Sequence, residues 1–157
     1  MRVYRDTSFA NDKTPYKTNI GIQFRHALGK DVHAPGFYLH IADDGCFFGA
    51  GIWRPESKVL NKIREFIADN PNAWKQAVTN RGFKKMYDLR GDTLVRPPRG
   101  YSADHPLIVD LKRKDFIAFA DFDASEIQGK NFAKTAGKAF AKTSAFMSYL
   151  CMAVDAN

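Results

Sequence analysis

A pair of short apolar-rich stretches with a polar turn between them constrains the fold of this chain more than any other feature. The stretches are residues Gly36–Ala42 and Cys46–Trp53, and Asp43-Asp44-Gly45 joins them. Glycine in so short a connection suits the positive φ of a tight hairpin turn. We therefore predict two antiparallel strands, and with them a sheet around which the rest of the chain packs.

The two faces of this predicted hairpin differ in chemistry. Successive side chains of a strand point to opposite faces, and the apolar face of the first strand consists of Phe37, Leu39 and Ile41. Tyr38 and His40 fall on the other face, which carries a hydroxyl and an imidazole. In the second strand, Gly49 and Gly51 indicate a bulge or a close approach of backbone or ligand.

The remaining periodicities predict an α+β fold, with a small mixed or mainly antiparallel sheet packed against several helices. Two more strands are expected, around Leu94–Arg96 and Phe116–Phe122. Helices are expected from Pro55 to Asn70, from Asn72 to Asn80, from an N-cap at Asp104 to Leu111, and from about Lys130 to Val154. The last is long and amphipathic, and its outer stripe consists of Lys130, Lys134, Lys138 and Lys142.

Length and composition predict a single domain spanning residues 1–157, because 157 residues of which 45% are hydrophobic bury one core. No stretch approaches the roughly 18 consecutive apolar residues of a membrane span, and no signal-peptide pattern is present. We expect a cytoplasmic protein without a membrane partner. Cys46 and Cys151 lie far apart without neighbouring histidines, so we predict free thiols, no metal site and no cofactor.

The charge of the chain favours an anionic partner. The formal net charge is +7, and clustered cations attract phosphates. None of the common nucleic-acid signatures is present, whether an RRM aromatic pair, a KH GXXG loop or a Cys/His finger. Nucleic acid on the lysine stripe is therefore an alternative to an ordinary solvated surface, and exchange of Lys134 and Lys138 for Glu tests it.

The segment from Tyr4 to Thr18 carries the most specific pattern in the chain, YRDTSFANDKTPYKT. It resembles the signature Arg-Asp-x-Arg-Phe-Ser-x-Asp-Lys-x-Pro-Tyr-Lys of the bacterial and fungal family known as domain of unknown function 2461. Further stretches follow in that family's order, namely Gly36–His40, Gly49–Pro55, Pro98–Tyr101 and Leu111–Lys114. The chain is identified as a member of this family, a resemblance that implies no established activity, substrate or cofactor.

The chain departs from the family pattern in two ways. Ser8 stands where the family usually has Arg and Ala10 where it usually has Ser, which weakens any anion site in the segment. The helical segment that usually precedes the signature is also expected to be missing. Its absence predicts exposed apolar surface and, through it, a homo-oligomer.

A candidate ligand site combines the cations of this segment with the polar face of the hairpin. Its predicted residues are Arg5, Asp6, Asp12, Lys13, Tyr16, Lys17, Tyr38, His40, Trp53, Arg64 and Arg99. Such a set suits a phosphate, nucleotide or carboxylate ligand. The best hypothesis is a small basic domain that binds an anionic ligand through the loop Asp6 to Thr18, with Phe9 as the apolar anchor of that loop.

Three other interpretations remain open. The charged pairs of the loop could simply fix its conformation. Metal-assisted hydrolysis, as in a nuclease, would use Asp6, Asp12, His40 and His105, although no HExxH, GxSxG or P-loop pattern accompanies them. The glycine-bearing hairpin could also serve a protein-interaction module without catalysis. No catalytic residue is predicted.

Overall fold

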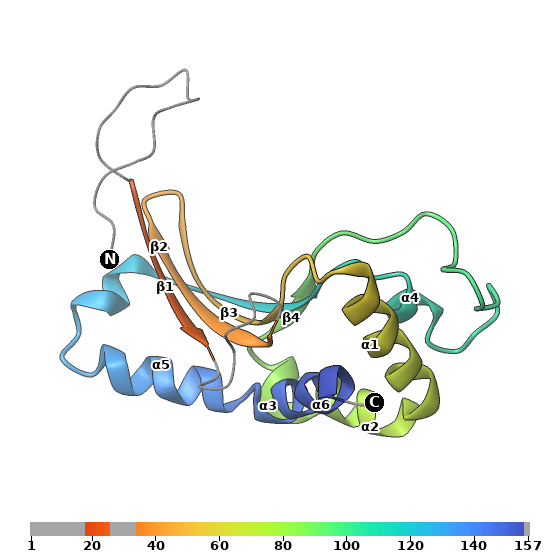
Figure 1. The fold of residues 1–157 in the computed structure, drawn as a ribbon. Coiled ribbons are helices and arrows are strands. Elements are labelled where there is room, and N and C mark those ends of the chain that lie inside the picture. Colours follow the sequence, from red (N-terminus) through yellow and green to blue (C-terminus); the bar gives the residue numbers. More distant parts are fainter. Residues whose placement is uncertain (1–17, 26–33, 156–157) are drawn as a thin grey trace, which may run out of the picture.

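One curved β-sheet with helices along one of its faces organises the chain in the computed structural model, which describes residues 18–25 and 34–155 (Figure 1). The strands are β1 Asn19–Arg25, β2 Gly36–Ala42, β3 Gly45–Ile52, β4 Asp88–Arg90 and β5 Phe116–Phe122. They lie in the order β1-β2-β3-β5-β4, and every neighbouring pair is antiparallel. The predicted α+β class is confirmed.

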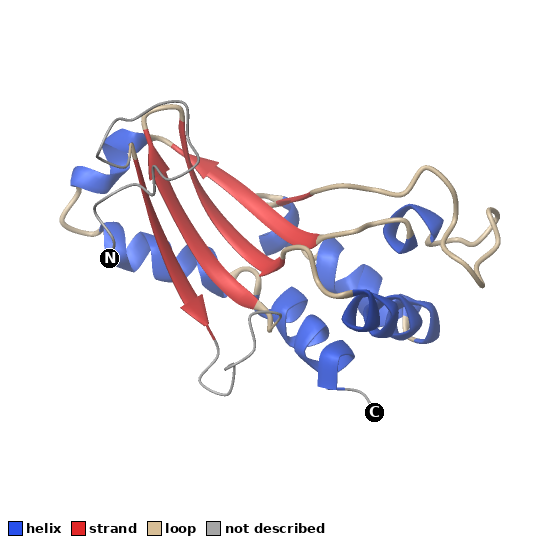
Figure 2. Ribbon diagram, turned by 45° about the horizontal axis from the view of Figure 1, so that its top comes forward, coloured by secondary structure: helices blue, strands red, loops and turns tan. Residues whose placement is uncertain are grey.

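The helices divide into two groups by position. They are α1 Ser57–Asp69, α2 Pro71–Thr79, α3 Arg81–Lys84, α4 Ile108–Leu111, α5 Phe132–Ala141 and α6 Ser144–Asp155, with a 3₁₀ helix η1 at Ala124–Gln128. Figure 1 shows α5, α6 and α3 along one face of the sheet, and α1 and α4 beyond one of its ends. Figure 2, with the other face turned toward the reader, shows no described helix in front of the strands. We call this second face the open face.

The core lies between the sheet and the helices. Phe48 of β3 and Phe116 of β5 are 1% and 0% exposed, and Trp74 of α2 and Phe146 of α6 are both 0% exposed. Trp74 contacts Phe116 edge-on, with ring centroids 5.8 Å apart. Burial of these large rings is the main source of stability, because each buried aromatic side chain removes a large apolar area from water.

The hairpin follows its predicted course. Ala42 pairs with Gly45 at the end of β2 and β3, so the turn consists of Asp43 and Asp44. The close backbone approach predicted for the glycine pair is confirmed at Gly51, where a Cβ would overlap the carbonyl oxygen of Phe116 in β5. Its φ of 129° is also one that other residues rarely adopt.

Two predicted elements around residue 100 are wrong. Leu94–Arg96 is not a strand, and the edge strand that pairs with β5 is β4, which begins six residues earlier in the chain. The backbone N–H of Leu94 instead donates to the carbonyl oxygen of Lys112, at 2.7 Å. Asp104 does not cap a helix, because α4 begins only at Ile108 and its N-cap is Leu107.

The long C-terminal helix is divided in two. Helix α5 ends at Ala141 and α6 begins at Ser144. Between them Thr143 is fully buried, and its hydroxyl donates to the carbonyl oxygen of Phe140 at 2.8 Å. This side-chain bond competes with continued helical pairing of the backbone, which is how threonine commonly bends or ends a helix.

Strand β1 was not predicted. Its apolar residues Ile20, Ile22 and Phe24 alternate with polar ones or glycine, and they face the helix side of the sheet because their partners in β2 are Ile41, Leu39 and Phe37. The strand lies at the edge of the sheet.

Candidate functional site

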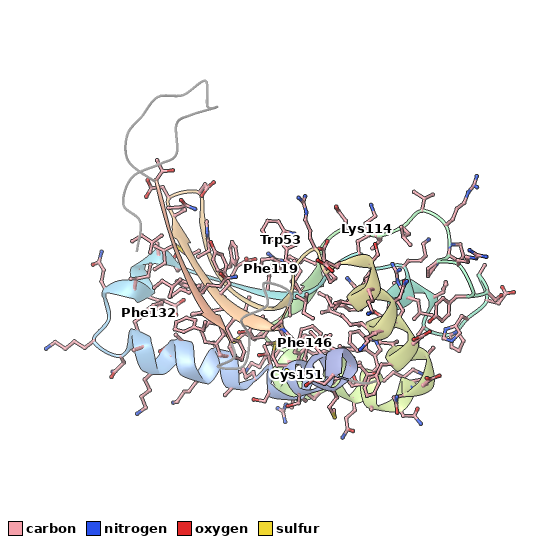
Figure 3. All side chains as sticks on the ribbon, viewed as in Figure 1. Trp53, Lys114, Phe119, Phe132, Phe146 and Cys151 are labelled. Carbon is pink, nitrogen blue, oxygen red and sulfur yellow. The ribbon has the colours of Figure 1, made fainter. Side chains whose placement is uncertain are left out.

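The open face gathers ring-bearing and charged side chains from β2, β3, β4 and β5, and a glycine and a glutamine from β1. Alternate positions contribute Gly21, Gln23, Tyr38, His40, Phe47, Gly49, Gly51, Asp88, Arg90, Ile117, Phe119 and Asp121. Phe119 lies on this side of the ribbon, and Phe132 and Phe146 lie on the helix side (Figure 3). The open face is therefore chemically distinct from the apolar face that packs against the helices.

Four rings form an aromatic cluster on the open face, centred on Phe47. The imidazole of His40 stacks on Phe47 with centroids 4.7 Å apart and planes 17° apart. Phe119 meets Phe47 edge-on at 4.9 Å, and Tyr38 lies 5.9 Å from it. The Tyr38 hydroxyl lies 3.3 Å from Nδ1 of His40, within hydrogen-bonding reach. All four side chains are partly accessible.

Glycines make room for this cluster. A Cβ on Gly21 would lie 2.5 Å from the Tyr38 hydroxyl, so the tyrosine ring lies over the place of the missing side chain. A Cβ on Gly49 would meet Tyr38 and Phe47 at ordinary contact distances of 3.5 and 3.9 Å. A side chain at the position of Gly21 would therefore displace the end of the Tyr38 ring, whereas Gly49 tolerates a small side chain.

An ion pair borders the aromatic cluster at strand β4. The guanidinium of Arg90 donates two hydrogen bonds to the carboxylate of Asp121, at 2.9 and 2.5 Å, and its Cζ lies 5.5 Å from the centroid of Phe119. The hydrogen bond from Arg90 lowers the pKa of Asp121. Both side chains are exposed, at 44% and 63%, so the pair contributes little to stability.

A second group of residues lies at the end of the sheet where β3 and β4 end and β5 begins. Trp53 follows β3 and is 69% exposed. The next residue, Arg54, has a φ of 47°, and its guanidinium carbon lies 5.4 Å from the Trp53 ring centroid. We call these two residues the Trp53–Arg54 turn. Trp53 and Lys114 project on the same side of the ribbon as Phe119 (Figure 3).

A buried carboxylate holds this turn. Asp115 is 3% exposed, and its Oδ1 accepts the backbone N–H of Arg54 at 2.7 Å. Its Oδ2 accepts the backbone N–H of Asp92 at 3.1 Å, just beyond β4. The carboxylate therefore joins the ends of three strands. It also stabilises the left-handed backbone conformation of Arg54, which costs free energy in every residue except glycine.

The turn presents cations to solvent. The side chains of Arg54 and Lys114 are exposed, and neither forms an ion pair with a described residue. A guanidinium stacked on an indole keeps its hydrogen-bond donors in one plane, which suits a phosphate or carboxylate. Backbone strain of the kind seen at Arg54 clusters at active sites and ligand-binding segments.

The structure brings together only part of the predicted site. Tyr38 and His40 are neighbours in the aromatic cluster, and Trp53 belongs to the turn at the sheet end. Arg99 is exposed in the connection between β4 and α4. The other predicted residues Arg5, Asp6, Asp12, Lys13, Tyr16 and Lys17, and the expected anchor Phe9, lie outside the described residues.

Arg64 has a structural environment away from the open face. It is 5% exposed within α1, and burial lowers the pKa of its guanidinium. Nε donates to the carbonyl oxygen of Leu111 at 2.8 Å and Nη2 to that of Arg113 at 2.9 Å. These bonds tie α1 to the chain around the end of α4, so this arginine satisfies backbone acceptors rather than joining Tyr38 and His40.

Sequence reasoning did not single out Phe47, Phe119, Arg54 and Asp115. Phe47 and Phe119 could have been predicted, because period-two alternation in β3 and β5 assigns both rings to the same face of the sheet as Gly49. Nothing local marks Asp115, whose bond partner Arg54 is 61 residues away. The left-handed conformation of Arg54 likewise has no signature in its residue type.

Other parts of the described chain offer weaker candidates. An open hollow of about 380 Å³ lies in the connection between β4 and β5, lined by Thr93, Val95, Pro97, Ala103, Ile108, Val109 and Lys112. Within residues 18–25 and 34–155, no three His, Cys, Asp or Glu side chains gather as they would around a metal ion. None of the helices described in this range has the length and apolar character that crossing a bilayer requires.

Comparison with known families agrees with the pattern in the sequence. The family described as conserved hypothetical protein (DUF2461) matches residues 1–149, which is nearly the whole chain. The protein belongs to this family. Searches of curated proteins and of solved structures gave no match. The description of DUF2461 names no activity, so the function of this member is argued from its own residues.

Proposed function

We propose that this DUF2461 protein binds an anionic ligand, bearing phosphate or carboxylate, at the sheet end beside the open face. The observation that carries the proposal is the Trp53–Arg54 turn, in which a buried carboxylate holds a strained arginine against an exposed indole. A protein retains such strain only where the surrounding structure compensates it. Ligand binding explains why an arginine, and not a glycine, occupies this position.

The chemistry of the neighbouring side chains supports an anion that also has a flat part. Arg54 and Lys114 supply positive charge, and Trp53 offers an apolar ring face of which much is accessible. The net charge of +7 raises the local concentration of anions around the protein. A small carboxylate or phosphate ester with a planar group, such as a nucleotide, satisfies both features.

The loop from Asp6 to Thr18 remains part of the proposal as a prediction from sequence. Arg5, Lys13 and Lys17 would add cations to the same ligand, and their substitution by Ala should weaken binding without loss of thermal stability, because exposed charges contribute about 0 to 1 kcal/mol. We assign the protein to the cytoplasm, a location that suits its two free cysteines.

The two tryptophans of the chain provide a direct test, because Trp53 is 69% exposed and Trp74 is 0% exposed. Iodide should quench only Trp53. Titration with adenosine monophosphate, pyrophosphate and citrate should reduce that quenching if the ligand covers the indole. A nucleotide effect several-fold stronger than that of pyrophosphate would identify a contribution from the planar group.

Matched variants assign the effect to the turn. Trp53→Phe leaves Trp74 as the only tryptophan and should abolish the response of indole fluorescence to iodide and to ligand. Arg54→Ala should weaken binding about tenfold, the loss expected for a charge-assisted hydrogen bond of about 1.4 kcal/mol. If none of the three anions protects Trp53 at millimolar concentration, and Arg54→Ala behaves as the unaltered protein does, the proposed site is wrong.

Nucleic acid on the lysine stripe is a second candidate, favoured by one observation. Lys130, Lys134, Lys138 and Lys142 are all exposed, and α5 lies on the helix side of the sheet rather than on the open face (Figure 1). Binding of single-stranded or duplex DNA that falls steeply with salt, and that Lys134→Glu with Lys138→Glu abolishes, would support it. The same double variant should leave binding at the Trp53–Arg54 turn intact.

A further inference from the structure

We infer that the hollow in the connection between β4 and β5 is a second binding site, which takes a small monocarboxylate with an apolar chain. We call it the β4–β5 hollow. Its volume is about 380 Å³, and its lining residues are Thr93, Val95, Pro97, Ala103, Ile108, Val109 and Lys112. Figure 1 shows this connection next to α1 and α4, at the end of the molecule away from α5. None of the lining residues belongs to the Trp53–Arg54 turn, so the inference is independent of the proposed function.

The walls of the β4–β5 hollow are mostly apolar. Five of its seven lining residues are valine, proline, alanine or isoleucine. Val95 and Val109 are 92% and 69% exposed, and both lie at the same concave surface rather than singly. A largely apolar hollow of roughly 300 to 1,000 Å³ is typical of small-molecule sites. An apolar chain in this hollow would remove the two valines from water, which favours binding.

The two polar lining residues determine which head group fits. Lys112 is half-buried, and its ammonium forms no ion pair with a described residue. It offers three N–H donors on a flexible stem, and the hydroxyl of Thr93 offers one more donor. The lining includes no Asp or Glu, so a cationic head group would find no partner. A single positive charge beside apolar walls matches the single negative charge of a carboxylate.

The charges around the hollow also favour an anion. Residues 91–114 contain five Lys or Arg and three Asp. One of the three, Asp110, accepts a hydrogen bond from Nε of Arg113 at 3.3 Å, so these two charges largely compensate each other. Arg96 and Arg99 are exposed in the same connection. The excess of cations attracts an anion toward the hollow from solution.

The backbone that carries Lys112 is held in place. Its carbonyl oxygen accepts the backbone N–H of Leu94 at 2.7 Å. The buried guanidinium of Arg64 donates to the carbonyl oxygens of Leu111 and Arg113 at 2.8 and 2.9 Å. These two residues precede and follow Lys112 in the chain. The hollow is therefore formed before a ligand binds, and little conformational entropy is lost on binding. Arg64 acts in this arrangement as a positioning residue.

Titration of protein labelled at the valine methyl groups, followed by NMR, tests the site with four probes. Hexanoate should shift the signals of Val95 and Val109, with a Kd on the order of a millimolar, and leave Val78 of α2 unchanged. Acetate has four methylene groups fewer and should bind at least about tenfold more weakly. Hexan-1-ol lacks the charge and should bind about tenfold more weakly. Hexylammonium, whose charge repels Lys112, should bind most weakly.

A matched pair of variants assigns the preference for the carboxylate. Lys112→Met keeps an apolar stem without the charge, so hexanoate should bind it no more tightly than hexan-1-ol does. Unchanged binding of hexan-1-ol would show that the hollow is still formed. Lys75→Met, at an exposed lysine of α2, should keep the full preference for hexanoate.

Three results would overturn the inference. The first is that hexanoate shifts neither Val95 nor Val109 at tens of millimolar. The second is that hexanoate and hexylammonium bind the unaltered protein equally well, a comparison that does not depend on the folding of any variant. The third is that Lys112→Met retains the preference for hexanoate over hexan-1-ol.

Discussion

The two faces of the five-stranded sheet differ in burial and in chemistry. On the helix side Phe48, Phe116 and Ala118 are almost fully buried, and their side chains complete the core. On the open face, residues one position away in the same strands, such as Phe47 and Phe119, remain partly accessible and lie beside charged groups. Burial explains the residues of the first face, whereas the second face needs another explanation.

This contrast separates stability from chemistry within one sheet. A ring on the helix side can be removed only at the cost of a cavity, because its neighbours are packed on all sides. A ring on the open face has solvent as one neighbour, so its loss disturbs less. Substitutions of similar size on the two faces should therefore differ in their effects on folding.

The largest difference is expected for two phenylalanines of β5. Phe116→Ala should destabilise the protein by about 3 to 5 kcal/mol, because the ring is 0% exposed and packs on Trp74. Phe119→Ala should cost about 1 to 2 kcal/mol, since its ring is only partly buried. Urea unfolding measures both. Equal losses of unfolding free energy in the two variants would mean that the open face is also buried in the folded protein.

The next largest effect concerns the carboxylate at the sheet end. Asp115→Ala leaves the backbone N–H groups of Arg54 and Asp92 without their acceptor, and we expect a loss of about 2 to 3 kcal/mol. Asp115→Asn keeps one acceptor oxygen and should lose less. The Asp92→Ala control keeps the backbone donor and should change the free energy of unfolding little. A neutral Asp115→Ala would show that the turn does not depend on this residue.

Two buried tyrosines should respond to the same substitution in opposite directions. The hydroxyl of Tyr87 has no hydrogen-bond partner among the described residues, so Tyr87→Phe should stabilise by about 1 kcal/mol. The hydroxyl of Tyr149 donates to the carbonyl oxygen of Phe66 at 2.9 Å, so Tyr149→Phe should destabilise by a similar amount. Parallel urea titrations would detect the opposite signs, and shifts of the same sign would contradict the assigned environments.

The same tyrosines predict how stability depends on pH. Burial raises the pKa of both Tyr87 and Tyr149, so the folded state keeps their protons when the unfolded chain begins to release its own near pH 10. The contribution of the two tyrosines to the free energy of unfolding is therefore complete below about pH 10, and it is lost as the pH rises through their pKa in the folded state. The free energy of unfolding should fall above about pH 10, and less steeply when both are replaced by Phe.

The smallest effect on stability is expected at Arg54, together with a clear effect on binding. Glycine relieves a left-handed conformation that costs about 1 to 2 kcal/mol but adds unfolded-state entropy, so Arg54→Gly should stabilise by about 0.5 to 1 kcal/mol. Arg54→Ala keeps the strained backbone conformation and should therefore not stabilise the protein. Both variants should lose affinity for the anion, which would show that Arg54 lowers the stability of the protein but is needed for binding. Unchanged binding would remove that interpretation.

The sequence was informative where structure is local. Period-two alternation and a two-residue turn define the β2–β3 hairpin, and the spacing of Val59, Ile63 and Phe66 defines α1. Tertiary contacts decide the rest. β4 has three residues and is a strand only because it pairs with β5. Its own sequence therefore carries little signal, and the sequence does not distinguish it from Leu94–Arg96 as a candidate strand.

The candidate site was predictable only in part for the same reason. Tyr38 and His40 were assigned to one face from alternation, which follows from strand geometry alone. The turn at the sheet end depends on contacts between residues distant in sequence, and a single sequence does not show which of several aspartates is buried. Arg64 is a further case, since its residue type gives no sign that its guanidinium donates to the backbone carbonyl oxygens of Leu111 and Arg113.

The Asp115 carboxylate also has a consequence for the order in which the molecule assembles. It bonds to partners 61 and 23 residues away, so the first bond needs the ends of β3 and β5 together, and the second needs those of β4 and β5. Non-local contacts form only after the entropy of loop closure has been overcome, and when such contacts lie outside the folding nucleus their loss accelerates unfolding more than it slows folding. The Trp53–Arg54 turn is then among the last parts of the chain to take shape, and a ligand held there would bind only molecules whose sheet is already complete.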